Sequence, residues 1–196
     1  MASKSRIELQ NWLAKIDVKG STLDVGGSQN PIVKRVKSWD VQDYKIMDLE
    51  QPHECKQQPD LCADIQSYPA IYDLYKRDYI FDNIFCIEVA EYWTNPQMAL
   101  ENMARLLSDD GMLYISFHFM YGLHNPKGED CLRYTKYGII KLMENIGLEI
   151  IEIIPRTLSE EGRFYLEKFY RAEGMRLDYS YPETWAEGHL VKARKK

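Results

Sequence analysis

Residues 81–89, FDNIFCIEV, form a nearly continuous apolar run, and this run constrains the fold more than any other feature. A half-exposed strand alternates apolar and polar residues, whereas a strand buried on both faces does not. Residues 112–119, MLYISFHF, follow the same pattern. Two such strands predict a parallel sheet that helices cover on both sides.

Helical and strand patterns alternate along the whole chain. We expect helices at 5–16, 31–38, 68–77, 96–107, 135–145 and 158–173, and strands at 21–25, 44–47, 61–63, 81–89, 112–119, 148–154 and 189–193. This order predicts a doubly wound α/β domain with a mostly parallel seven-stranded sheet. The last strand follows an extended segment rich in Tyr and Pro, so we expect it to be antiparallel. Residues 1–196 then form a single domain, with a leading helix inside 1–18.

Composition excludes several classes of protein. No stretch of eighteen apolar residues is present, so we expect no transmembrane helix, and the N-terminus has no signal-peptide pattern. The four cysteines lie at irregular spacings, which favours reduced thiols and a cytoplasmic protein. A net charge of −5 argues against a general nucleic-acid binder.

Acidic residues stand at the carboxyl ends of four successive predicted strands. They are Asp24, Asp48, Asp64 and Glu88. In an open α/β sheet, ligands bind outside these strand ends. Acids also form turns, so one alone would carry little weight, but four at one edge predict a ligand site.

The turn after the first strand indicates the kind of ligand. Gly26 and Gly27 allow a ligand to approach the backbone, and Asp48, twenty-two residues beyond Gly26, suits the hydroxyls of a ribose. The fingerprint of a dinucleotide site needs two further glycines, but Ser28 and Pro31 stand there. A nicotinamide-dependent reductase is therefore disfavoured, and a nucleoside with a cationic tail, such as S-adenosylmethionine, fits better.

The chain resembles the class I S-adenosylmethionine-dependent methyltransferases. The segments that carry the resemblance are LDVGGS at 23–28, Asp48, the Asp64-Ile65 pair, CIEVAEY at 86–92 and LLSDDGML at 106–113. It implies a cofactor site at Asp24, Gly26, Gly27, Ser28, Asp48, Leu49, Asp64, Ile65, Glu88 and Tyr92. Ser28 departs from a family glycine, Tyr92 from the usual histidine, and Asp109-Asp110 from lysine-proline.

The loop at 120–134 resembles a pattern found in small bacterial methyltransferases. In this chain it contains Leu123-His124 and then DCLRYT at 130–135. The resemblance implies a small-molecule or glycan acceptor, methylated at oxygen or nitrogen, and contacts from His118, His124, Arg133 and Tyr134. His124 or Glu88 would take the acceptor's proton, and the loop would close as a lid. In the alternative interpretation, Arg133 only pairs with Asp130 and His118 is only a buried core residue.

Three further possibilities remain open from the sequence. A vestigial cofactor-binding domain that serves as a partner-binding module is the main alternative function. His53, Cys55 and Cys62 fit no ordinary zinc spacing, so we expect no metal. Tyr165, Tyr170, Tyr179 and Tyr181 would cover either the acceptor or the face of a homodimer.

Overall fold

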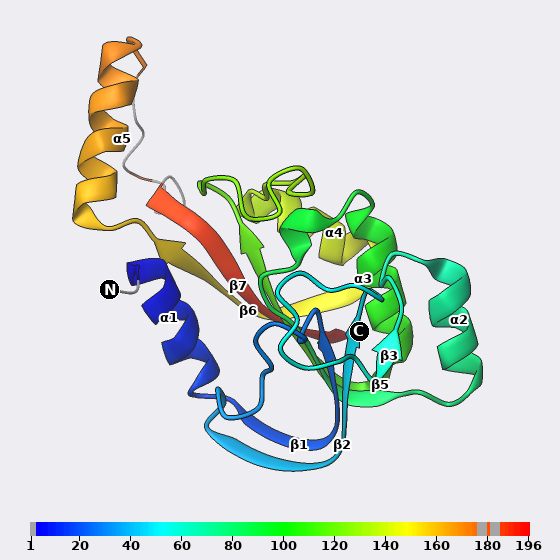
Figure 1. The fold of residues 1–196 in the computed structure, drawn as a ribbon. Helices are drawn as coiled ribbons and strands as arrows, with labels where there is room; N and C mark the ends of the chain where they lie inside the picture. Colours follow the sequence, from blue (N-terminus) through cyan, green and yellow to red (C-terminus); the bar gives the residue numbers. More distant parts are fainter. Residues whose placement is uncertain (1–2, 176–179, 181–184) are drawn as a thin grey trace.

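The computed structural model describes residues 3–175, 180 and 185–196, and its centre is a seven-stranded sheet (Figure 1). Its strand order is β3-β2-β1-β4-β5-β7-β6. The strands are β1 (Asp17–Val25), β2 (Ser38–Asp48), β3 (Leu61–Cys62), β4 (Phe81–Cys86), β5 (Leu107–His118), β6 (Leu148–Thr157) and β7 (Ala186–Lys195). The first five pair in parallel, and β7 runs antiparallel to both β5 and β6. The predicted fold class and the reversed last strand are confirmed.

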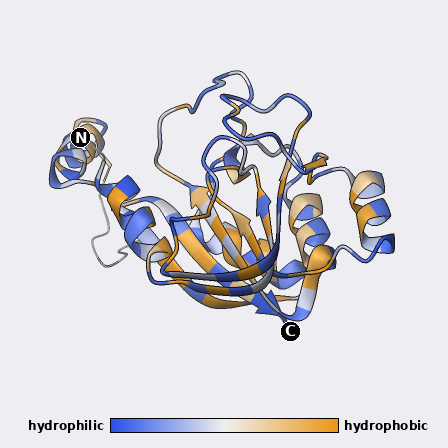
Figure 2. Cartoon of the chain, turned by 60° about the horizontal axis from the view of Figure 1, so that its bottom comes forward, coloured by the Kyte–Doolittle hydropathy of each residue, from blue (hydrophilic) through white to orange (hydrophobic). Residues whose placement is uncertain are grey.

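Helices cover both faces of the sheet. They are α1 (Lys4–Leu13), α2 (Tyr68–Lys76), α3 (Pro96–Leu106), α4 (Lys136–Asn145) and α5 (Glu160–Ala172). The larger hydrophobic core joins the sheet to α2, α3 and α4, and the smaller one lies under α1 on the other face. Figure 2 shows the hydrophobic strands at the centre of the molecule.

The helix expected at 31–38 is absent, and that prediction is wrong. Residues 26–37 instead form turns, and Lys34 has a positive φ of 69°. Asp24 Oδ2 accepts a hydrogen bond of 2.7 Å from the backbone N–H of Ile32, whose side chain is fully buried in the smaller core. These contacts fix the segment against the end of β1, and β2 begins directly after it. No helix N-terminus therefore faces the glycine turn.

Strand β4 ends three residues earlier than the apolar run predicted. Glu88 has a positive φ of 62°, and its N–H donates to Ser116 Oγ at 2.8 Å. A short 3-10 helix, η1 (Ala90–Tyr92), follows. The break turns the acidic residues of this segment toward the carboxyl edge of the sheet.

Helix α5 projects away from the rest of the molecule (Figure 1). None of its residues is buried, and Phe164, Tyr165 and Phe169 are each more than half exposed. Tyr179 and Tyr181 lie outside the described residues, so the homodimer face stays a prediction. Among the described helices, none is long and apolar enough to cross a bilayer.

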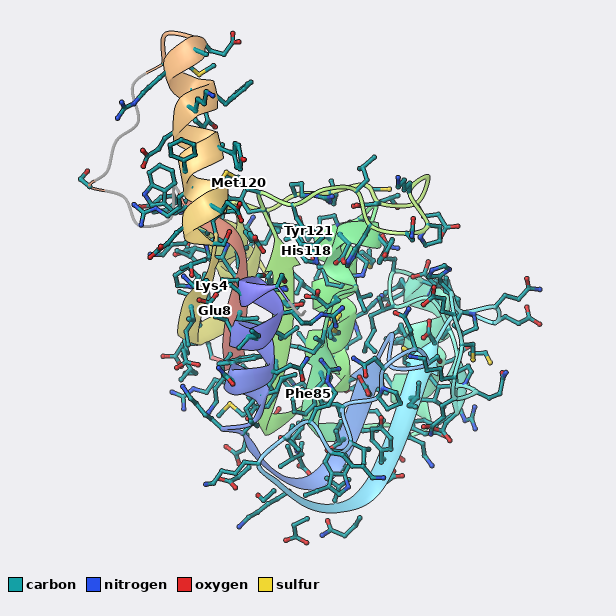
Figure 3. All side chains as sticks on the ribbon, turned by 60° about the vertical axis from the view of Figure 1, so that its left-hand side comes forward. Lys4, Glu8, Phe85, His118, Met120 and Tyr121 are labelled. Atoms are coloured by element: carbon teal, nitrogen blue, oxygen red, sulfur yellow. The ribbon has the colours of Figure 1, made fainter. Side chains whose placement is uncertain are left out.

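Helix α1 is attached to β6 by polar contacts. Glu8 accepts hydrogen bonds of 2.7 Å from both the backbone N–H and the hydroxyl of Thr157. Ser5 is fully buried and accepts a bond of 2.8 Å from Arg156 Nε, which is buried as well. Figure 3 shows Lys4 and Glu8 on α1, with His118 at the upper end of the sheet.

We predict that Ser5→Ala lowers the free energy of unfolding by roughly 1–3 kcal/mol, because it leaves the Arg156 Nε–H buried without an acceptor. Urea denaturation measures the change. The control is Ser67→Ala, since the Ser67 side chain precedes α2 but makes no capping bond there. Equal stability of the two variants would contradict the prediction.

Candidate functional site

The turn after β1 is tightly packed, and this explains its two glycines. Gly26 has a φ of 74°, and a Cβ there would collide with Val89 Cγ2. A Cβ on Gly27 would collide with the carboxyl group of Asp24. The backbone N–H of Gly26 donates to Met47 O at 2.8 Å, which ties the turn to the end of β2. Side chains are therefore excluded from the strand edge where a ligand would lie.

Two of the expected acids along this edge, Asp48 and Asp64, accept hydrogen bonds from nearby backbone N–H groups. Asp48 accepts one hydrogen bond from the Ser28 N–H at 3.2 Å and another from the Leu49 N–H at 2.9 Å. Asp64 accepts a bond of 2.9 Å from the Gln66 N–H just before α2. Asp48 thus holds the turn against β2, while Asp64 shapes the start of the next helix.

Asp24 is buried at the end of β1. Its Oδ2 accepts hydrogen bonds from the Ile32 N–H at 2.7 Å and from the Tyr44 hydroxyl at 2.8 Å. Burial raises the pKa of Asp24 from 3.8 to about 6, and these two bonds only partly offset it. The carboxylate organises the turn rather than lying open to a ligand.

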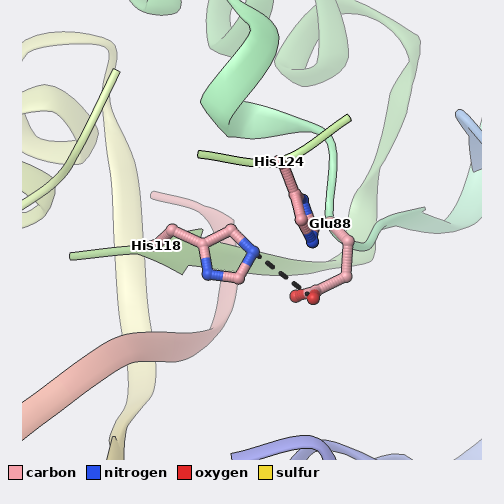
Figure 4. Close-up of side chains that lie close together, drawn as sticks. All are labelled: Glu88, His118 and His124. Carbon is pink, nitrogen blue, oxygen red and sulfur yellow. Dashed lines mark ion pairs between the residues drawn. The ribbon is translucent and has the colours of Figure 1, made fainter. Parts of the chain in front are cut away.

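The remaining site residues form one group, which we call the histidine–carboxylate cluster. It consists of Glu88, Glu91, His118, His124 and Arg156. Glu88 and Glu91 follow β4, His118 ends β5, His124 lies in the loop 120–134 and Arg156 is on β6. Figure 4 shows Glu88, His118 and His124 facing one another.

His118 lies between the two carboxylates and is 1% exposed. Its Nε2 is 3.3 Å from Glu88 Oε2 and 3.2 Å from Glu91 Oε1, yet neither contact has the geometry of a hydrogen bond. Burial alone would lower the pKa of His118, but the two carboxylates outweigh it and raise the pKa to about 9.

Arg156 compensates the charge of Glu88. Its Nη1 donates to Glu88 Oε1 at 2.5 Å, and Ser116 Oγ donates to the same oxygen at 3.0 Å. Burial alone would raise the pKa of Glu88, but His118 and Arg156 hold it well below its ordinary value. Glu88 is therefore a carboxylate in this site.

Glu91 binds His124. Glu91 Oε1 lies 2.7 Å from His124 Nδ1, and the Glu91 side chain is completely buried, whereas that of His124 is 26% exposed. The contacts with His118 and His124 also lower the pKa of Glu91 against the opposite effect of burial. Neither Glu91 nor Arg156 is among the expected site residues. Glu91 directly follows the apolar run, so its position indicated that it could lie at a strand end. Arg156 lies 68 residues from Glu88, and no sequence pattern indicated that the two would meet.

Hydrogen bonds attach the second half of the loop 120–134 to the body. Arg133 pairs with Asp130 and donates to the carbonyls of Tyr121 and Gly122. The Tyr134 side chain is buried, and its hydroxyl donates to Ala90 O at 2.7 Å. Arg133 and Tyr134 thus hold the loop that carries His124, and their expected contact with an acceptor stays a prediction.

The described residues bring three possible ligand atoms, of two kinds, together at one place. A carboxylate oxygen of Glu88 and one ring nitrogen each of His118 and His124 lie within 4.8 Å of one another. His53 instead lies beside Glu54, and Cys55 Sγ donates to Gln57 O. Any metal would therefore be expected at the histidine–carboxylate cluster rather than at the cysteines.

Residues 26–115 match the protein family described as a methyltransferase domain. The matched segment is slightly less than half of the chain, and it supports the resemblance to the class I S-adenosylmethionine-dependent methyltransferases. This match agrees with the expected family, and it supports S-adenosylmethionine as the expected cofactor. No curated protein sequence matches the chain.

Solved methyltransferase structures share the fold at low sequence identity. A protein from Bacillus halodurans C-125, described as a putative methyltransferase, is 15% identical with a TM-score of 0.60, over 96% of this chain and 97% of that one. A Haloferax volcanii methyltransferase in complex with the activator Trm112 is 13% identical with a TM-score of 0.62, over 98% and 89%. The mitomycin 7-O-methyltransferase MmcR is 12% identical with a TM-score of 0.55, over 98% and 54%.

The first strand edge fits this cofactor. The glycine turn leaves no room for a side chain beside Val89, and Asp48 stands at the end of the neighbouring strand. Because the helix expected after the turn is absent, no helix N-terminus is available there, and the role of the glycine turn in holding a cofactor stays a prediction.

We predict that Asp24 makes folding stability depend on pH between about 4 and 6. Its pKa is higher in the folded state than in the unfolded state, so the folded protein binds more protons and loses stability as the pH rises through this range. The loss is at most ~3 kcal/mol. Asp24→Asn removes the titrating group and should flatten this part of the curve. Urea denaturation from pH 4 to 7.5 measures both proteins, and parallel curves would contradict the prediction.

Proposed function

We propose that this methyltransferase transfers a methyl group to an oxygen or nitrogen atom of a small-molecule or glycan acceptor. The observation that carries the proposal is the arrangement of the carboxyl edge. The glycine turn and Asp48 lie at the ends of β1 and β2, and the histidine–carboxylate cluster lies at the ends of β4 and β5. One edge thus combines a nucleoside site with ionisable groups.

The cofactor side is assigned to the residues of β1 to β4. Bound S-adenosylmethionine supplies a methyl group already activated by its sulfonium. Gly26, Gly27 and Ser28 would lie against its amino-acid end, and Asp48 with Leu49 would hold its ribose. Asp64 and Ile65 would contact the adenine, while Tyr92 and Glu88 border the acceptor side.

Between the two candidate bases, the contacts favour His124. Glu88 is engaged by Arg156 and Ser116, whereas His124 uses one ring nitrogen for Glu91 and is partly exposed. The second ring nitrogen would accept the proton of the acceptor, and Glu91 would fix the orientation of the ring. The protein otherwise aligns the acceptor and excludes water.

The loop 120–134 is suited to act as a lid. Its second half is anchored, since the backbone N–H groups of Cys131 and Leu132 both donate to Glu91 O. A Cβ on Gly122 or Gly128 would meet nothing within 4 Å, so there is free space at these two positions. The bonds from the Tyr92 hydroxyl to Asn125 O and from the His124 N–H to Asp130 would break when the first half moves. We propose that this half moves and carries His124 toward the acceptor.

The small-molecule acceptor has the support of one structural neighbour, which is named as a mitomycin 7-O-methyltransferase. The main alternative, a vestigial domain that binds a partner protein, has the support of the missing helix at 31–38 and of the exposed aromatic residues on α5. Another neighbour is a methyltransferase in complex with a protein activator. Cofactor binding followed by methylation of any acceptor would decide against this alternative.

We predict that Asp48→Ala weakens binding of S-adenosylhomocysteine by about 10- to 150-fold, because it removes a charged acceptor for the ribose hydroxyls. Isothermal titration calorimetry measures the affinity, with Asp40→Ala as the control because Asp40 is exposed near the other end of β2. Unchanged affinity in a folded Asp48→Ala variant would remove Asp48 from the site. No binding by the wild type would overturn the proposed function.

We also predict that hydrogen exchange divides the loop into two halves. Amides of Cys131, Leu132 and Tyr134 should exchange slowly because they are bonded to the body, and amides of 120–123, 125, 127 and 128 should exchange faster. Addition of S-adenosylhomocysteine should slow exchange in the first half only. Equal protection of both halves in the free protein would exclude a lid.

A further inference from the structure

The position of His118 Nε2 calls for a cation between two carboxylates. This nitrogen is fully buried, lies close to one oxygen each of Glu88 and Glu91, and makes no hydrogen bond. The second Glu91 oxygen is also buried without a partner. A bare nitrogen lone pair facing two carboxylates would be repelled, so either a proton or a metal ion must lie there.

The distances suit a metal ion. With bonds of about 2.0–2.2 Å in a tetrahedral site, neighbouring ligand atoms lie roughly 3.3 Å apart. His118 Nε2 is 3.3 Å from Glu88 Oε2, and a ring nitrogen of His124 is within 4.8 Å of both side chains. The three side chains come from β5, the segment after β4 and the loop, and Figure 4 shows them directed at a common point.

The neighbouring groups hold these three side chains in place. Glu91 Oε1 contacts both imidazole rings, and Arg156 and Ser116 bind the other oxygen of Glu88. The Tyr121 ring stacks on His118, with 4.4 Å between ring centroids. The hydrogen-bonded partners of His124 and Glu88 are of the kind found around the ligands of metal sites.

The charges of the described groups also leave room for a cation. Glu88 and Glu91 carry two negative charges, and Arg156 supplies one positive charge. A divalent ion would leave the cluster with one positive charge in excess. The negative charge of a deprotonated acceptor oxygen would neutralise this excess positive charge. Such a negative charge forms on the acceptor in the proposed reaction.

We propose that Glu88, His118 and His124 bind a divalent transition-metal ion, with Glu91 as the carboxylate that orients the imidazole of His124. Two imidazoles and one carboxylate favour Zn²⁺ or Fe²⁺ over Mg²⁺ or Ca²⁺. The catalytic meaning of this site rests on the proposed function. With the ion bound, His124 would be a ligand and no longer a base, and the charge of the ion would instead favour the deprotonated form of the acceptor oxygen. Binding of the ion itself does not depend on methyl transfer.

The test uses the full chain after removal of metal with a chelator. Zn²⁺ is titrated by calorimetry, and Co²⁺ is added separately to record its visible absorption. We expect one equivalent of Zn²⁺ and the absorption bands of four-coordinate Co²⁺. His124→Asn should weaken Zn²⁺ binding by more than about 100-fold, and Glu91→Gln by roughly 10- to 100-fold.

His53→Asn is the matched control, because His53 also lies beside a glutamate, Glu54, but far more exposed. It should bind Zn²⁺ like the wild type. Absence of stoichiometric Zn²⁺ binding by the wild type, or equal binding by His124→Asn, would overturn the site and leave a proton on His118 as the cation. Titration with S-adenosylhomocysteine, done in parallel, tests the proposed function independently of the metal.

Discussion

The carboxyl edge of this protein depends on positive charges that compensate the carboxylates of Glu88 and Glu91. Glu91 is fully buried and the Glu88 side chain is only 16% exposed, so an unpaired charge at either place would be costly. Arg156 and His118 supply the opposing charges, and each comes from a different strand. The pairing therefore draws β4, β5 and β6 together at their ends, and it holds the ionisable groups at a fixed place. Any reaction at this edge would take place beside these paired charges.

The same balance links the edge to the rest of the molecule. Arg156 is bonded to Ser5 on α1, so the N-terminal helix supports the charge that neutralises Glu88. Glu91 receives the backbone of the loop 120–134 and the ring of His124. The backbone carbonyl of Glu91 thus anchors a surface loop, while its buried carboxylate pairs with a histidine that is partly exposed. A fixed support beneath a loop that can move suits a site that must admit an acceptor and then exclude water.

The cofactor side is built differently, mainly from backbone. The glycine turn is packed so closely against Val89 and Asp24 that side chains are excluded, and the segment that follows is held by one buried carboxylate instead of by a helix. Sequence pattern predicted a helix at 31–38 because Pro31 is a favourable first residue. The sequence pattern could not indicate that Asp24 accepts a hydrogen bond from the Ile32 N–H, because that bond forms only once β1 is in place.

The sequence by itself determined the fold class, the seven strands and the reversed last strand, because hydrophobic periodicity and turn motifs depend on residues that are neighbours in the chain. It also placed the acids Asp24, Asp48, Asp64 and Glu88 at strand ends. Only the tertiary structure decided which of these acids are engaged by partners, and that Glu91 and Arg156 belong to the site. The reason is physical: Arg156 and Glu88 are 68 residues apart, and the strength of their interaction comes from shared burial, which exists only after the sheet has formed.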